Sequence, residues 1–93
     1  MVVGVLTLEI HLPYAHSLKD KRQTLRRLKD RLHNQFNVAV AELDHQDNWQ
    51  RATVGVVTLS NETPHVARLL ESANAEAEKI LGGDLVGSHT EFL

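Results

Sequence analysis

Residues 2–36, VVGVLTLEIHLPYAHSLKDKRQTLRRLKDRLHNQF, contain one change of hydrophobic pattern that decides the fold. Alternating apolar side chains predict a strand with one buried face over residues 2–12. Pro13 ends this strand because its ring nitrogen has no hydrogen to donate to a ladder. Leucines at helical spacing then predict a helix over residues 17–35, with Ser17 as its N-cap. The alternating set is Leu6, Leu8, Ile10 and Leu12, and the helical set is Leu18, Leu25, Leu28 and Leu32.

The rest of the chain predicts a hairpin, a second helix and a last strand. Residues 36–43, in which Phe36, Val38 and Val40 share one face, predict one strand, and residues 51–60, which are rich in β-branched residues, predict the next. A polar stretch separates them, so together they predict a hairpin. Thr63 is a suitable N-cap residue for a second helix, which is predicted to end at Gly82. Residues 85–92 then predict a fourth strand.

The order β-α-β-β-α-β predicts an α+β fold of the ferredoxin-like plait type. In this fold a four-stranded antiparallel sheet carries two helices on one face. The length favours a single domain over residues 1–93. The other sheet face is then uncovered, provided that Val86 and Phe92 point inward. Its expected residues are Val5, Thr7, Glu9 and His11 from the first strand and Leu85, Gly87, His89 and Glu91 from the last.

The composition excludes several classes of protein but does not indicate a particular chemical activity. The chain has 93 residues, of which 42% are hydrophobic and 24% charged, as in ordinary globular domains. It has no cysteine, which excludes disulfides and thiolate metal sites. No apolar run has the length of a membrane helix, and the start lacks the basic segment of a signal peptide. We therefore expect a cytoplasmic protein.

No motif predicts catalysis, a cofactor or a metal. There is no nucleophile motif and no glycine-rich phosphate loop, so no catalytic residue is assigned and a non-enzymatic protein is expected. Glu42, Asp44, His45 and Asp47 could form an acid/base set, but a hydrated turn explains them equally well. Among the six histidines, the best metal cluster is Glu9, His11 and His89, but it lacks the spacing of a metal site.

The first helix is strongly basic. Seven of the ten Lys and Arg residues lie in residues 19–31, where only two Asp residues offset them, although the whole chain has a net charge of −2. Such a helix is typical of a surface that binds phosphates. The alternative is that these cations pair with carboxylates of the second helix, at Glu71, Glu76 and Glu78. The candidate nucleic-acid-binding residues are Lys19, Lys21, Arg22, Arg26 and Lys29.

Three motifs carry a resemblance to a known family. They are S-L-K-D-K-R at residues 17–22, F-N-V-A-V-A-E at residues 36–42 and D-N-W-Q-R-A at residues 47–52. With these motifs the sequence resembles the YlxP-like family of small bacterial proteins of uncharacterised function, over nearly the whole chain. The resemblance implies a ferredoxin-like fold. Genes of the family often lie beside genes for translation initiation and ribosome maturation, which implies a ribosome-associated role. The resemblance supplies no established catalytic residue.

Two functions are weighed from these observations. The first is docking on ribosomal RNA or a ribonucleoprotein through the basic helix. RNA recognition by the sheet face is rejected, because that face has no central aromatic side chain to stack on bases. The second is a homodimeric interaction module that uses the uncovered face. Its interaction surface is predicted to contain Thr7, Glu9, His11, His89 and Trp49.

Overall fold

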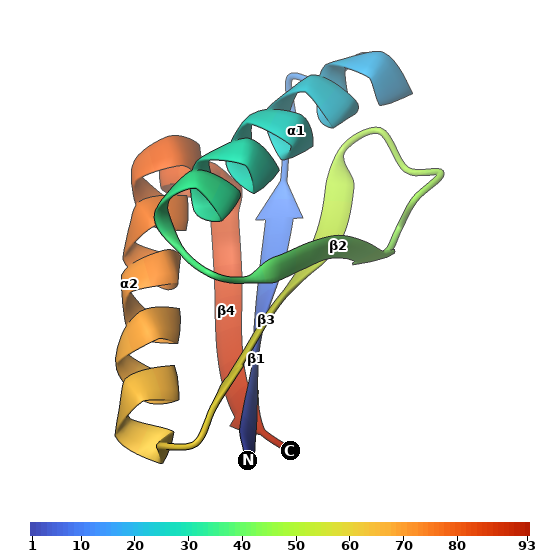
Figure 1. The fold of residues 1–93 in the computed structure, drawn as a ribbon. Coiled ribbons are helices and arrows are strands. Elements are labelled where there is room, and N and C mark those ends of the chain that lie inside the picture. Colours follow the sequence, from blue (N-terminus) through green and yellow to red (C-terminus); the bar gives the residue numbers. More distant parts are fainter.

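The structure is a computed structural model that describes residues 1–93. Its elements follow the predicted order (Figure 1). They are β1 (Val2–His11), α1 (Leu18–Gln35), β2 (Ala39–Asp44), β3 (Arg51–Ser60), α2 (Thr63–Leu81), the 3-10 turn η1 (Gly82–Asp84) and β4 (Leu85–Phe92). No helix carries an apolar segment long enough to cross a lipid bilayer.

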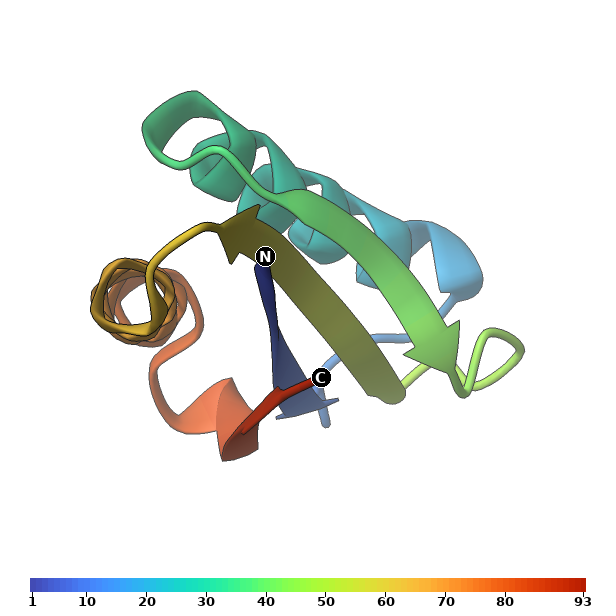
Figure 2. The ribbon, with the colours of Figure 1, turned by 60° about the horizontal axis from the view of Figure 1, so that its bottom comes forward.

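The four strands form one antiparallel sheet in the order β2-β3-β1-β4. Both helices lie on the same side of this sheet, and the sheet twists so strongly that β2 runs across the direction of β4 (Figures 1 and 2). The two chain ends lie close together because the C-terminal end of β4 pairs with the N-terminal part of β1. This arrangement confirms the ferredoxin-like plait.

The core fills the space between the helices and the inner sheet face. On β1 the buried side chains are Leu6, Leu8 and Ile10, and their partners on β3 are Val56, Val54 and Ala52. The helices contribute Leu28, Leu32, Val66 and Leu70 to the same cluster. Burial of each such aliphatic side chain contributes about 2 kcal/mol, so that the inner face fixes the register of the sheet.

Gly4 allows α2 to approach β1 closely. A Cβ atom at this position would lie 2.5 Å from Val66 Cγ1 and 2.8 Å from Leu70 Cδ1. Both atoms belong to fully buried side chains, which have little room to move. The lack of a side chain at Gly4 therefore sets the distance between α2 and the sheet.

The last strand differs from the prediction at its start. The pairing of β1 with β4 shifts between Glu9 and Ile10, so one extra residue, Val86, is accommodated as a bulge. Leu85 therefore packs against the core, while Val86 is 63% exposed, so their predicted orientations were wrong. Phe92 pairs opposite Gly4 on the inner side as predicted.

Two boundaries also differ from the predicted ones. Strand β2 begins at Ala39 instead of residue 36, because Phe36 ends α1 by donating its amide hydrogen to the Leu32 carbonyl. Helix α2 has Glu62 as its N-cap instead of Thr63, and no side chain caps it.

Candidate nucleic-acid interface

Helix α1 starts with the predicted cap. The Asp20 amide donates to Ser17 Oγ at 3.1 Å, and the Asp20 carboxylate accepts from the His16 amide at 2.9 Å. These two bonds satisfy the amide groups of Asp20 and His16 at the start of the helix. The cap also places one negative side chain beside the basic residues that follow.

Lys21 is not on the basic surface, and its prediction as a nucleic-acid contact was wrong. The residue is only 1% exposed. Its Nζ donates to Glu42 Oε2 at 2.8 Å and to the carbonyl oxygens of His45, Gln46 and Arg51 at 2.8, 3.2 and 3.3 Å. An ammonium group with four oxygen partners offers nothing to an external phosphate. Lys21 instead ties α1 to the loop between β2 and β3, which lies near the first turns of this helix (Figure 1).

The spacing of the leucines contains the signal that reveals this burial. Lys21 lies three residues after Leu18, four before Leu25 and seven before Leu28, so it falls on the apolar side of the helix. A buried cation at such a position needs a carboxylate partner. Glu42, on the inner side of β2 opposite Val54, is that partner.

One further cation of α1 is paired within the molecule. Arg31 Nη1 lies 3.0 Å from Glu76 Oε1 on α2. Glu76 is one of the carboxylates of the second helix that the alternative interpretation expected to pair with the cations of the first helix. The remaining five cations are exposed and make no ion pair. These five are Lys19, Arg22, Arg26, Arg27 and Lys29, and we call them the α1 cations.

The α1 cations extend around the outer side of the helix on two flanks. The flank beside β2 carries Arg22, Arg26 and Lys29, which line a groove of about 450 Å³. The other flank carries Arg27, which lines a second groove of about 400 Å³ together with Arg26 and Arg31. Arg26 and Asp30 line both grooves, so the positive surface extends across the helix with one carboxylate in it. Arg22 and Lys29 are two turns apart, or about 10 Å along the axis.

The uncovered sheet face brings together part of the predicted interaction surface. Thr7 lies opposite His89, and Glu9 accepts a hydrogen bond from Thr53 Oγ1 at 2.8 Å. His11 lies at the end of β1, opposite Arg51. Trp49 lies in the loop between β2 and β3 and is 52% exposed, so it belongs to no strand of the sheet. No three His, Asp or Glu side chains of the structure meet in a way that would hold a metal ion.

The part of this face toward β2 is apolar, which the sequence analysis missed. Leu43 lies over Gly55, where an added Cβ atom would come within 2.8 Å of Leu43 Cδ1. The sequence signal for this apolar region is in β3, where residues 54–57 are apolar or glycine on both faces. We call this group the apolar patch. It consists of Val3, Val5, Ala39, Ala41, Leu43, Val57 and Leu59, around Gly55.

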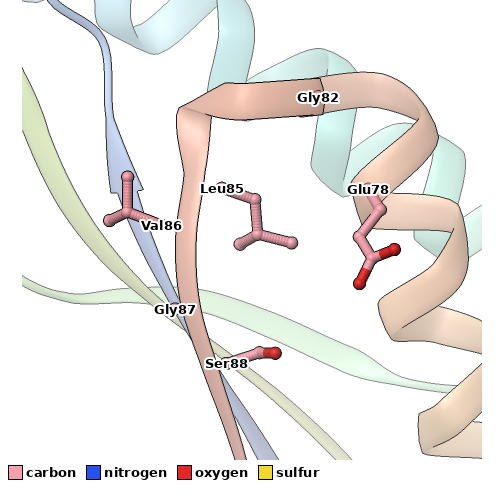
Figure 3. A pocket seen from close by; sticks show the side chains of 6 residues that line it. All are labelled: Glu78, Gly82, Leu85, Val86, Gly87 and Ser88. Carbon is pink, nitrogen blue, oxygen red and sulfur yellow. The ribbon is translucent and has the colours of Figure 1, made fainter.

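A crevice of different character lies between the end of α2 and β4 (Figure 3). Its polar side chains are Glu78, which extends from α2 toward β4, and Ser88. Leu85 points toward α2, whereas Val86 points to the other side of the strand. No cation lines this crevice of about 390 Å³, so it has no charge complementary to a phosphate.

The comparisons with known proteins identify a family and a fold. A model of a protein family of unknown function, DUF503, matches residues 3–89. The uncharacterized protein YlxP of Bacillus subtilis is 38% identical over 60 residues, which are 64% of this chain and 65%, just under two thirds, of that protein.

Among solved structures, a designed protein with a ferredoxin fold, LFR1, is similar with a TM-score of 0.55 and 10% identity, over 100% of this chain and 83% of that chain. A putative antibiotic biosynthesis monooxygenase from Bordetella bronchiseptica has a TM-score of 0.54 and 13% identity, over 100% of this chain and 96% of that chain. At such identities the likeness concerns the fold alone. The family match extends over nearly the whole sequence, and the chain belongs to the DUF503 family of proteins of unknown function.

Proposed function

We propose that this protein is a non-enzymatic cytoplasmic protein that docks on ribosomal RNA through the α1 cations. The observation that carries the proposal is that five exposed cations on one helix have no carboxylate partner within the molecule. Three of the predicted contacts, Arg22, Arg26 and Lys29, line one groove, and Arg27 lines the other. Lys19 is exposed two turns before Arg26, on the same side of the helix. Lys21 is excluded from the site.

The mode of binding follows from the kind of groups that are present. Lys and Arg side chains on an outer helix face contact phosphates, which carry no information about sequence. No aromatic side chain lines the grooves beside the α1 cations, so stacking on bases is not part of this proposal. The protein is therefore proposed to recognise the backbone of a folded RNA, with an affinity that depends steeply on salt.

Co-sedimentation with ribosomal subunits over a series of salt concentrations tests this proposal. The variant Lys19→Glu/Arg27→Glu removes two of the α1 cations. We expect it to weaken binding and to make the slope of log affinity against log salt shallower by about 1.5. The matched control is Arg68→Glu/Lys79→Glu, which makes the same change in net charge on α2 and should bind like the natural sequence. Binding that ignores salt, or equal losses in both variants, would contradict the proposal.

The apolar patch favours a second candidate function, the formation of a homodimer. Its exposed members, Leu43 and Leu59, are large side chains that have no cover from this chain. The patch itself carries no charge, so two copies of it can meet without repulsion. The α1 cations lie on the other side of the sheet, so a dimer through the patch leaves them open to RNA.

A further inference from the structure

The flank of α1 that carries Arg22, Arg26 and Lys29 borders a free edge of the sheet. Strand β2 pairs with β3 on one side only, and its other side has no partner strand. The groove of about 450 Å³ lies between this edge and α1. Its apolar lining is formed by Leu25, Val40, Ala41 and Val54.

The groove has an excess of positive charge. Two carboxylates line it beside the three cations, but the one of Glu42 is already bound by Lys21 Nζ at 2.8 Å. Only Asp30 then opposes the three cations, which leaves an excess of two positive charges. None of the three cations makes an ion pair. The groove therefore suits an anionic ligand.

The β2 edge, with the sequence AVAELD, contains no lysine and no proline, two residues by which proteins protect a free strand. Its residues 39–42 pair with β3 without a shift, and the bulge of this strand lies beyond them, at Leu43. The opposite edge, β4, is protected by the bulge at Val86 and carries polar side chains at Ser88, His89 and Glu91. The regular edge formed by residues 39–42 is a template for the main chain of another extended segment.

The surroundings of β2 on the two faces of the sheet determine which side chains such a segment would need. On the helix side, a strand added beside β2 would meet Arg22, Arg26 and Lys29. On the other side it would meet a groove of about 230 Å³ that Ala41 and Leu43 help to line. Because successive side chains of a strand point to opposite faces, acidic residues would alternate with apolar ones.

We propose that the β2 edge binds an extended segment of a partner protein, with alternating acidic and apolar residues, as an additional strand of the sheet. This function goes beyond RNA docking and uses the main chain of β2. A second copy of this chain is a poor occupant, because pairing of two β2 edges would place two α1 helices side by side with like charges facing. Single-stranded RNA is also a poor occupant, since no aromatic side chain lines the groove.

The test uses a fluorescent peptide of about ten residues in which Glu and Val alternate. Its control is a peptide of the same composition in which all Glu residues precede the Val residues. Anisotropy measures affinity, and amide hydrogen exchange of residues 39–42 reports strand addition. We expect the alternating peptide to bind more tightly and to slow this exchange. The block peptide should leave the exchange unchanged.

Variants locate the binding site of the peptide. Arg22→Glu/Lys29→Glu removes two cations of the groove and should weaken binding by about tenfold or more. Arg68→Glu/Lys79→Glu makes the same change in net charge on α2, and its affinity for the peptide should change by less than about twofold. Lys19→Glu/Arg27→Glu, the variant of the RNA test, removes two α1 cations that do not line the groove, so it should weaken RNA binding and leave peptide binding unchanged. Loss of RNA binding and loss of peptide binding are therefore distinguishable.

Four outcomes would overturn this proposal. Equal binding of both peptides without protection of residues 39–42 would indicate a purely electrostatic contact. Protection of these amides by rising protein concentration alone would indicate a second copy on the edge. Protection by an oligouridylate, and not by the peptide, would assign the groove to RNA. Failure of the peptide to bind would also reject it, and the salt-dependent RNA test would be unaffected.

Discussion

At the scale of single residues, Lys21 shows how a charge can serve the fold and not a partner. Its ammonium group has one carboxylate and three carbonyl partners, and these partners come from β2, the following loop and the start of β3. The loop has an unusual backbone at His45, whose φ is 66°. Bonds from Lys21 to the His45 and Gln46 carbonyls hold the loop in this conformation, which costs free energy for a residue other than glycine.

Replacement of Lys21 should therefore destabilise the protein strongly. In Lys21→Met the Glu42 carboxylate and the loop carbonyls lose their donor, and we expect the free energy of unfolding to fall by about 3 kcal/mol. Urea denaturation measures this change. Lys19→Met is the matched control, because Lys19 is exposed and unpaired, and it should change the free energy by less than about 0.5 kcal/mol. Similar values for the two variants would reject the structural role of Lys21.

At the scale of elements, the sequence predicted the helices and strands, which hydrophobic periodicity specifies. It did not predict the features that depend on how the strands pair. Both helices and all four strands were predicted in the correct order, because their apolar residues recur at helical or alternating spacing. The bulge at Val86 was missed because an extra residue is set by the pairing of β4 with β1, which leaves no local pattern.

The candidate site was predictable only in part. The exposed positions of Arg22, Arg26 and Lys29 follow from helical spacing. The ion pair of Lys21 with Glu42 joins residues that are 21 positions apart. The groove beside β2 also depends on which strand forms the edge, and several strand orders are compatible with the same local patterns.

A hydrogen bond between two connecting segments gives a prediction for alkaline pH. The Tyr14 hydroxyl, in the segment between β1 and α1, donates to Asp84 Oδ2 in η1. This bond is the main cause that raises the pKa of Tyr14 above its ordinary value of 10.0, with smaller contributions from burial and from the charge of Asp84. Because the folded pKa is the higher one, the stabilisation is present below the unfolded pKa and is lost as pH rises through the folded pKa.

Tyr14 is the only tyrosine, so phenolate absorbance reports on it alone. In Asp84→Ala we expect the pKa of Tyr14 to fall back toward 10.0, because both the acceptor and its negative charge are removed. Asp47→Ala, which removes an exposed carboxylate elsewhere, should leave the titration unchanged. The change in stability should be small, since Tyr14 is 58% exposed. An unchanged titration in Asp84→Ala would contradict the assigned hydrogen bond.

At the scale of the whole molecule, two surfaces of different chemistry lie on opposite sides of the sheet. The α1 cations lie on the helix side, where the two layers are arranged as Figure 2 shows. The apolar patch lies on the side that no helix covers. A molecule of this kind can bind an anion with one side and a neutral surface with the other, since neither contact blocks the other.

The apolar patch predicts self-association of the natural sequence. Leu43 and Leu59 are 54% and 61% exposed on one face, and burial against a second copy would remove them from water. We expect sedimentation equilibrium to detect a dimer whose population rises with concentration. In Leu43→Lys/Leu59→Lys two charges from each copy would be buried at the interface, so this variant should be monomeric at the same concentrations. Val86→Lys is the control, because Val86 is equally exposed but lies on the bulge outside the patch, and it should dimerise normally. A natural sequence that stays monomeric at high concentration, or a control that also loses the dimer, would show that the patch does not pair with itself.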